Sequence, residues 1–302
     1  MKKNINKKNK IKACLKAIRP YHAIKNSLLI IPLLMSHQYF NTIAIENIFL
    51  GIIIFCLFAS SAYLINDLVD LKTDQQDTKK QKRPFASGVL SLKTGYIFSA
   101  LLILFALSLS IFLPANFLIS VLSYYSLALL YTFFIKKLKW LDAILLAILY
   151  SIRVFSGMTL IENGFSFWLI FFILSLFFSL ALLKRYVELT RLSMPNVSIP
   201  GRAYQLKDKS NLAILGRSSG YLSILIFIFY IYSEKAKFFY SSPLLLWLIC
   251  PCLFIWFNRV WRLARERKID DDPVVVIVND SFSWFFLMLI MIITLLATWI
   301  HP

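Results

Sequence analysis

Four aspartates gather where an apolar stretch of the sequence ends, in the segment NDLVDLKTDQQD. On a helix with 100° between residues, Asn66, Asp67, Asp70, Asp74 and Asp77 occupy an arc of roughly 100°. Carboxylates this close repel one another unless a cation lies among them, and Mg²⁺ in particular is held by carboxylates together with substrate phosphates. The spacing therefore indicates a metal site, and a polar helix end paired with its own lysines is the other interpretation.

Basic side chains follow these acids directly along the chain. They can bind the remaining oxygens of a diphosphate, and the arginine is capable of bidentate contact. Acids for a metal and bases for a phosphate together indicate a site for a metal-bound diphosphate. The four basic residues are Lys79, Lys80, Lys82 and Arg83.

A second charged group follows a later apolar stretch, in LLKRYVELTRL. Lys184, Glu188 and Arg191 share one helical face there, and Arg185 lies beside them. This group is richer in arginine than in carboxylate, which favours binding of anionic groups over binding of metal. A positive-inside loop with an ordinary Glu–Lys pair is the alternative. The segment that follows adds Arg202, Tyr204, Asp208 and Arg217.

One apolar stretch carries a charge deep inside it. Arg153 comes eleven residues after Asp142 on the same helical face, which is about 16 Å deeper by helix rise. An arginine at that depth costs several kcal/mol unless it lines a polar cavity, so we interpret it as lining a pocket. Tyr131, Lys136 and Lys137 are expected at the same rim as Asp142 and could reach a phosphate.

The elements that must position these residues are membrane helices. The chain has 302 residues, 59% of them hydrophobic and 16% charged, which is too apolar for a soluble domain. Apolar stretches long enough to cross ~30 Å of hydrocarbon predict an all-α integral membrane protein of about nine helices. These stretches are roughly 23–40, 47–65, 94–113, 115–135, 140–160, 166–183, 213–232, 241–258 and 281–300.

The distribution of basic residues predicts the orientation. Of 33 lysines and arginines, all but Arg153, Lys235 and Lys237 fall on one face if the spans alternate. Cytoplasmic loops retain such residues, so we expect a cytoplasmic N-terminus in the inner (cell) membrane. The same count explains the net charge of +18 without a nucleic-acid partner. We expect residues 1–22 to form a basic cytoplasmic tail, either a short amphipathic helix or a disordered segment, before one membrane domain over 23–302.

Two smaller groups carry less information. The four cysteines, which lack partner histidines at metal-site spacing, are interpreted as packing residues of the membrane helices. The acidic run Asp270 to Asp272 is explained equally by a solvated turn or a second metal site. The cysteines are Cys14, Cys56, Cys250 and Cys252.

The acidic segment resembles the first motif of the UbiA superfamily of intramembrane prenyltransferases, Asn-Asp-x-x-Asp-x-x-x-Asp. Lys80 and the sequence RPFASG fit the continuation of that motif. Within the superfamily the chain is most similar to the decaprenyl-phosphate phosphoribosyltransferase branch. Four segments carry this narrower match: RPYHAIKN, LLKRYVEL, GRAYQLKDKSNLAILGRSSGYLS and WRLARERKIDDDPVVVIVND. Lys25 in the first of them is expected to bind substrate.

The resemblance also has departures. Gln75 and Asp77 stand where the family pattern has Arg and His. The Asp-x-x-x-Asp pair that aromatic prenyltransferases carry after the sixth helix is replaced by Glu188 and Asp208 among arginines. Its loss counts against a prenyl diphosphate as donor.

The resemblance implies a Mg²⁺-dependent transferase with its site at the cytoplasmic face of a UbiA-like bundle. Asp67, Asp70 and Asp74 would hold the metal against phosphoribosyl diphosphate, and the acceptor would be a polyprenyl phosphate. Its phosphate would be held by Arg153 or by the group from Lys184 to Arg191. A prenyl diphosphate donor with an aromatic acceptor, as in quinone or haem-type biosynthesis, is the alternative. A transporter with an acidic vestibule is a third hypothesis, which the position of the acids at one membrane face disfavours.

Overall fold

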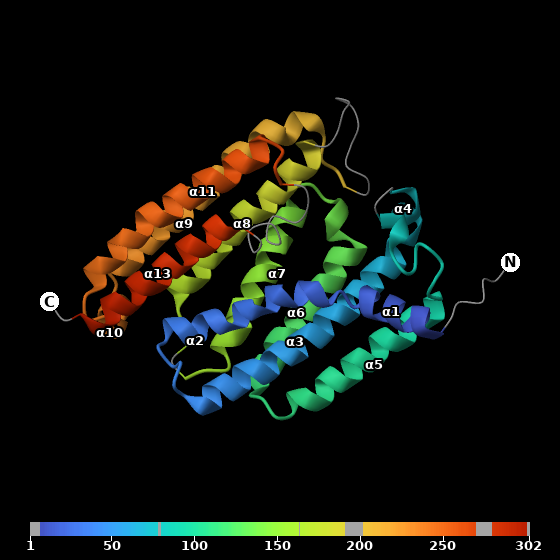
Figure 1. The fold of residues 1–302 in the computed structure, drawn as a ribbon, viewed down its shortest axis with the longest axis horizontal. Coiled ribbons are helices and arrows are strands. Elements are labelled where there is room, and N and C mark those ends of the chain that lie inside the picture. The colour runs from blue at the N-terminus through green and yellow to red at the C-terminus, as the bar shows by residue number, and fades with distance from the viewer. Residues whose placement is uncertain (1–6, 78–79, 163, 191–201, 270–279, 301–302) are drawn as a thin grey trace. The chain divides into compact units, whose positions relative to one another are not determined.

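The computed structural model describes residues 7–77, 80–162, 164–190, 202–269 and 280–300 (Figure 1). These residues are mainly helical, which confirms the expected all-α class. In the described residues, eight helices are long and apolar enough to span a membrane, so this is an integral multi-pass membrane protein. The chain divides into two compact units, one of residues 1–137 with 152–165 and the other of 138–151 with 166–302.

The first of the nine expected spans differs from the prediction, whereas the other eight are confirmed. Pro20–Ile30 forms the 3₁₀ helix η1, and the α-helix α2 covers only Ile31–Met35. His37, with a φ of 58°, follows shortly after α2 ends. Apolar composition therefore predicted a longer continuous α-helix than the structure has, because residues 20–30 follow 3₁₀ geometry and α2 ends at Met35.

The first unit is built on α3, Thr42–Val69, which begins where the Asn41 side chain accepts a hydrogen bond from the Ala44 amide at 3.2 Å. This helix packs along two others, and Phe55 and Phe58 are fully buried on it. The two are α5, Leu92–Ser110, and α6, Ala115–Phe133 (Figure 1). The unit also contains α1 (Lys7–Ala17), α4 (Leu71–Gln76), η2 (Lys80–Lys82), η3 (Ile135–Lys137) and the later residues of α7 (Leu141–Met158).

The basic N-terminal segment forms helix α1, which matches the helical rather than the disordered interpretation over these residues. It packs Ala13 and Ala17 against Leu64, Leu68 and Phe85. Those three residues come from α3 and from the turn after the acidic segment, so α1 is fixed beside the aspartates. The division into a tail of residues 1–22 and a single membrane domain stays a prediction.

The second unit is a bundle in which α8, Phe167–Thr190, packs along α9, Lys209–Ile231 (Figure 1). Helix α11, Ile249–Arg265, contacts both. Helix α13, Ser281–Trp299, begins at Asp280, which caps the Ser283 amide at 2.9 Å and pairs with Arg259 at 2.5 Å. The unit also contains η4 (Leu206–Asp208), α10 (Glu234–Phe239), η5 (Pro243–Leu248) and the first residues of α7.

Two glycines set the spacing between α9 and α11. A Cβ on Gly216 would lie 2.2 Å from Cζ2 of Trp261, and one on Gly220 would lie 2.7 Å from the Phe257 ring. Small residues four apart let membrane helices approach closely, because lipid supplies little hydrophobic drive for their association. The rings of α11 therefore lie directly on the backbone of α9.

A third glycine yields a stability prediction. A Cβ on Gly157 of α7 would lie 2.3 Å from the backbone oxygen of Leu29 in η1. Although alanine favours a helix over glycine by up to about 1 kcal/mol, we expect Gly157→Ala to lower the melting temperature, since overpacking costs about 1–3 kcal/mol. Thermal unfolding of the purified protein in detergent measures this. Ser108→Ala, at an exposed position of α5, is the control, and a higher melting temperature for Gly157→Ala would contradict the clash.

Candidate functional site

The acidic segment is carried by two helices rather than one. Helix α3 ends at Val69, Asp70 takes φ −84° and ψ 5°, and α4 begins at Leu71. The Asp70 amide still bonds to the Asn66 carbonyl at 2.9 Å, and its own carbonyl accepts from the Asp74 amide at 2.8 Å. The expected single helical face is thus interrupted at Asp70, so helical spacing alone did not give the relative directions of the carboxylates.

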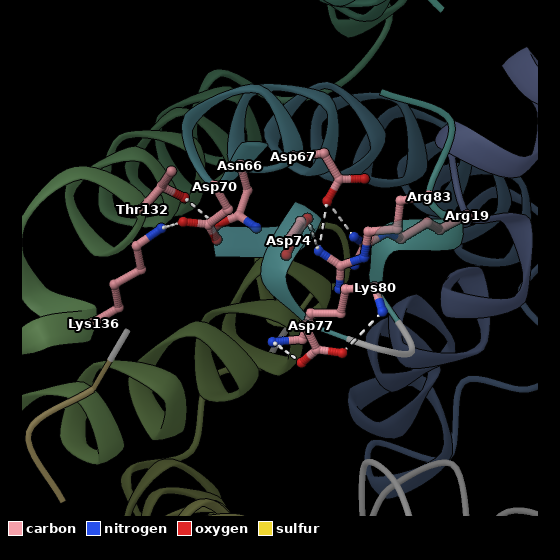
Figure 2. Close-up of polar contacts among 10 residues, drawn as sticks. All are labelled: Arg19, Asn66, Asp67, Asp70, Asp74, Asp77, Lys80, Arg83, Thr132 and Lys136. Carbon is pink, nitrogen blue, oxygen red and sulfur yellow. Dashed lines mark hydrogen bonds and ion pairs between the residues drawn. The ribbon is translucent and has the colours of Figure 1, made fainter. Parts of the chain in front are cut away.

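Two arginines converge on the buried acids (Figure 2). Arg83 Nη1 lies 2.6 Å from Oδ2 of Asp74 and 3.2 Å from Oδ1 of Asp67. Arg19 pairs with the same Oδ1 of Asp67 and lies over the Tyr63 ring at 5.2 Å. Both aspartates are only 2% exposed. One guanidinium therefore bridges two carboxylates, and a second approaches one of them from the other side.

The remaining acids have their own cations (Figure 2). Lys136, which follows α6, pairs with Oδ1 of Asp70. Lys80 Nζ lies 3.6 Å from Oδ2 of Asp77, and its amide donates to Oδ1 at 2.9 Å. Asp77 therefore has a contact within its own turn, away from the bridge made by Arg83. Nearby, Asn66 accepts a hydrogen bond from Thr132 of α6 at 3.3 Å.

The position of Arg83 follows from the RPFASG sequence. Phe85 is 3% exposed and lies in the apolar cluster with α1 and α3, which anchors the turn. Gly88 has φ 73°, where glycine is favoured, and its amide bonds to the Phe85 carbonyl at 3.0 Å. The Leu90 amide bonds back to Pro84 at 3.0 Å. A turn fixed at both ends therefore directs the arginine toward the acids.

Among the described residues, the contacts pair four carboxylates with four cations, so this first cluster is charge-balanced there. Its members are Arg19, Asp67, Asp70, Asp74, Asp77, Lys80, Arg83 and Lys136. The side chains are of the oxygen type that Mg²⁺ prefers, which fits the predicted metal. Within the described residues, however, no three metal-binding side chains stand together in metal-binding geometry. Burial raises the pKa of Asp74 and Arg83 opposes that rise. Metal binding would therefore require Arg83 and Lys136 to release their carboxylates.

Arg153 is buried, as expected, at 4% exposure. Its Nε donates to Asn26 Oδ1 at 3.0 Å and its Nη2 to the Tyr124 hydroxyl at 2.8 Å. It also lies 5.6 Å from the Phe55 ring on α3. Phe55 comes twelve residues before Asp67, about 18 Å along the helix. Arg153 therefore contacts α3 well away from the acids, and its catalytic role stays a prediction.

A second cluster lies within the second unit. Arg185 is fully buried, with Nε 2.6 Å from Asp142 and Nη1 2.5 Å from Glu188. Arg202 reaches the same two carboxylates at 3.4 and 3.7 Å, and the Tyr204 hydroxyl donates to Asp142 at 2.5 Å. Burial and the bond to Asp142 raise the pKa of Tyr204, so it stays a donor. This network joins α7, α8 and the segment before α9.

The other predicted residues fall in several places. Lys25 and Lys136 are buried, and Lys80, Tyr131 and Lys184 are partly exposed. Asp208 pairs with Lys139 at 2.5 Å and caps the Gln205 amide, apart from the pairs of Asp142. Arg217 lies against Trp261 of α11 and does not join the cluster of Arg185. Lys79, Arg191 and Asp270 to Asp272 lie outside the described residues.

Sequence reasoning missed Arg19, Asn26 and Lys139. Arg19 and Asn26 both lie in RPYHAIKN, where sequence reasoning expected a role for Lys25 alone. Arg19 has φ 51° at the end of α1, which directs the chain back along α3. Helical spacing could not reveal this contact, because 48 residues separate Arg19 from Asp67.

Arg19 yields a prediction about donor binding. We expect Arg19→Gln to weaken binding of a diphosphate donor about tenfold, since charge-assisted hydrogen bonds contribute roughly 1.5–3 kcal/mol. Calorimetric titration with the donor and Mg²⁺ measures this. Lys16→Gln is the matched control, because Lys16 is exposed on the same segment and, within the described residues, its Nζ donates only to the backbone oxygen of Lys82. If both variants lose the same donor affinity, the effect of Arg19 comes from the positive charge of the segment and not from its contact with Asp67.

The fold and the first cluster define a polytopic helical membrane protein with a buried, charge-balanced acidic site. The sequence profile described as the UbiA prenyltransferase family matches residues 28–289, so the chain belongs to this family, whose members are transferases. The resemblance inferred from the acidic motif is thereby confirmed.

Relatives and solved structures agree with this assignment. The chain is 31% identical to a protein named "Uncharacterized protein y4nM" of Sinorhizobium fredii over 92% of its length, but spans only 54% of that relative. It is 31% identical to the decaprenyl-phosphate phosphoribosyltransferase of Mycolicibacterium smegmatis, covering 94% of this chain and 79% of the relative. A UbiA homologue of Archaeoglobus fulgidus, solved with DMAPP and Mg²⁺, superposes with a TM-score of 0.70 at 11% identity over 93% of this chain and 98% of that one. At that identity the match supports the fold alone.

Proposed function

We propose that this protein transfers phosphoribose from phosphoribosyl diphosphate to a polyprenyl phosphate, with Mg²⁺ as cofactor. The arginine-rich second cluster carries the proposal. Asp142 and Glu188, its two central acids, are each bound by Arg185 and Arg202. The sequence after α8 therefore supplies arginines in place of the Asp-x-x-x-Asp pair with which aromatic prenyltransferases would bind a second metal ion. The mycobacterial relative, named for this reaction and matching 94% of the chain, supports the same donor.

The residues of the first cluster have separate roles in this proposal. Asp67, Asp70 and Asp74 would hold Mg²⁺, which would neutralise charge on the leaving diphosphate. Arg83, Lys80 and Lys136 would exchange their carboxylate partners for diphosphate oxygens. Each of these cations would move from a carboxylate oxygen to a neighbouring diphosphate oxygen. The carboxylates that they leave would be balanced by Mg²⁺, so no unpaired charge would result.

The chemistry itself requires little of the protein. The bond from the anomeric carbon to the diphosphate oxygen breaks, and a bond from that carbon to an oxygen of the lipid phosphate forms. The acceptor phosphate is already ionised at neutral pH, so no general base is needed. Preorganised cations at the leaving group are therefore the main contribution of these side chains.

Orientation belongs to the proposal as well. We place the N-terminus and the first cluster on the cytoplasmic side of the cell membrane, where a soluble phosphorylated donor is available. The concentration of lysine and arginine in the loops of one face supports this. Cysteine labelling of introduced surface positions in intact cells would test it.

A competition between donors tests the function. In the first reaction, purified protein receives Mg²⁺, polyprenyl phosphate and labelled phosphoribosyl diphosphate. In the second reaction it receives Mg²⁺, a labelled prenyl diphosphate and an aromatic acceptor. We expect labelled phosphoribosyl lipid in the first reaction and no prenylated aromatic product in the second. The prenyl alternative is favoured by the fold shared with a homologue solved with DMAPP, and prenylated product without phosphoribosyl lipid would establish it in place of our proposal.

A further inference from the structure

The seam between α9 and α11 holds an arginine that the proposed reaction does not use. Arg217 lies in the GRSSGY sequence of α9, with its guanidinium 5.8 Å from the centre of the Trp261 ring. Within the described residues it forms no ion pair, and its buried Nε has no hydrogen-bond partner. An arginine without an anionic partner on a membrane helix is expensive, so its surroundings need an explanation.

Arg217 lines a shallow hollow of about 160 Å³. Phe257 and Trp261, held against the glycines of α9, form its wall, and Tyr221 and Asn258 complete it. The Tyr221 hydroxyl donates to Asn258 Oδ1 at 2.9 Å. A cation, an amide and a phenol thus meet beside aromatic rings. The hollow is too shallow to enclose a ligand, so a bound group would rest at its mouth.

The hollow lies near the start of α9 and near the end of α11. Arg217 comes eight residues after Lys209, where α9 begins, and Trp261 comes four residues before Arg265, where α11 ends. These offsets are about 12 Å and 6 Å along the two helices. Tryptophan and tyrosine gather at the level of lipid headgroups, which is also where lipid phosphates lie.

The surface along the seam is cationic at one end and apolar at the other, as the headgroup and the acyl chains of an anionic lipid would require. Asn258, Arg262 and Arg265 follow at helical spacing and are all exposed. Neither Arg262 nor Arg265 forms an ion pair in the described part of the chain. In the opposite direction, Phe254 is 52% exposed and stacks on Tyr221 at 5.6 Å. A cationic end therefore continues into an exposed apolar surface.

We infer that this seam binds an anionic phospholipid, with its headgroup phosphate at Arg217 and Asn258 and its acyl chain along Tyr221 and Phe254. A guanidinium can bind two phosphate oxygens at once, which would give Arg217 the anionic partner that it lacks among the described residues. The simpler interpretation is that Arg217 only packs its stem on Trp261 while its head reaches water. The two interpretations predict different lipid binding.

Native mass spectrometry of the purified protein in detergent, without donor or acceptor, separates them. The probes are phosphatidylglycerol, phosphatidylcholine and glycerol phosphate. We expect retention of phosphatidylglycerol over the other two, and a loss of affinity of about fivefold to tenfold in Arg217→Gln. Lys93→Gln removes an exposed cation at the start of α5, away from the seam, and is expected to bind as the wild type does.

Each other result is informative. Unchanged phosphatidylglycerol binding in Arg217→Gln, or an equal loss in Lys93→Gln, would overturn the site. Binding of glycerol phosphate as tight as that of the lipid would overturn the lipid as occupant. If Arg217→Gln does not fold, as judged by size exclusion, Asn258→Leu and Arg262→Gln give the same test. Because no transfer is measured, failure here leaves the proposed function standing, and the reverse also holds.

Discussion

Asp67→Asn is expected to lower the rate of the proposed transfer by about a thousandfold or more. The substitution keeps the shape of the side chain but removes its charge, leaving Arg19 and Arg83 beside a neutral amide. A metal ion held by fewer carboxylates stabilises the leaving diphosphate less, and several kcal/mol of lost stabilisation corresponds to that factor. We expect Mg²⁺-dependent binding of the donor to be lost in parallel.

The matched control for this variant is Asp77→Asn. Asp77 belongs to the same acidic segment, but it pairs with Lys80 within one turn, and its side chain is 27% exposed. Exposed pairs contribute about 0–1 kcal/mol, so we expect at most a severalfold change. Initial rates with labelled donor and calorimetric binding of donor with Mg²⁺ measure both variants. Equal losses in the two would place the metal elsewhere on the segment, and near-normal activity of Asp67→Asn would remove Asp67 from the site.

Asp142→Leu is expected to destabilise the fold strongly. Arg185 and Asp142 are both fully buried, and removal of Asp142 leaves Glu188 alone, among the described contacts, to balance Arg185 and Arg202. Breaking such a buried pair typically costs about 3–5 kcal/mol. We therefore expect a large fall in the melting temperature in detergent, together with loss of protein from the membrane fraction on expression.

A double variant distinguishes buried charge from lost packing. Asp142→Leu with Arg185→Met removes both charges, and we expect it to recover more than half of the stability that the single variant loses. Glu234→Gln, whose partner Lys237 is 60% exposed, is the control and should change little. If the double variant is no more stable than Asp142→Leu, the loss comes from packing around Tyr204 and not from the excess positive charge.

The first unit shows why the acids were easier to find from sequence than the contacts that their cationic partners make. Asp67, Asp70 and Asp74 lie within eight residues, so helical periodicity brings them to one region regardless of the rest of the fold. Arg83 follows them closely and was also predicted. Arg19 and Lys136, by contrast, come from elements 48 and 66 residues away, whose approach depends on packing of α1 and α6 against α3.

The second unit repeats this distinction. Arg202, Asp208 and Arg217 were grouped because they are neighbours in sequence, but Arg202 turns to Asp142, Asp208 to Lys139 and Arg217 to Trp261. The segment leading into α9 is short, so small changes of direction send adjacent side chains to different helices. Proximity in sequence therefore identified the charged residues of this region but did not predict which side chains they contact.

By itself, the sequence determined the all-helical membrane class, eight of the spans, the acidic motif and the family that it identifies. These properties are local, because a run of apolar residues must form a helix in lipid and a fixed spacing fixes a helical face. Only the tertiary structure decided that the helix breaks at Asp70, that each acid already has a cation, and that Arg217 lies on its own seam. Such pairings depend on which distant side chains packing brings together, and residue spacing carries no information about that.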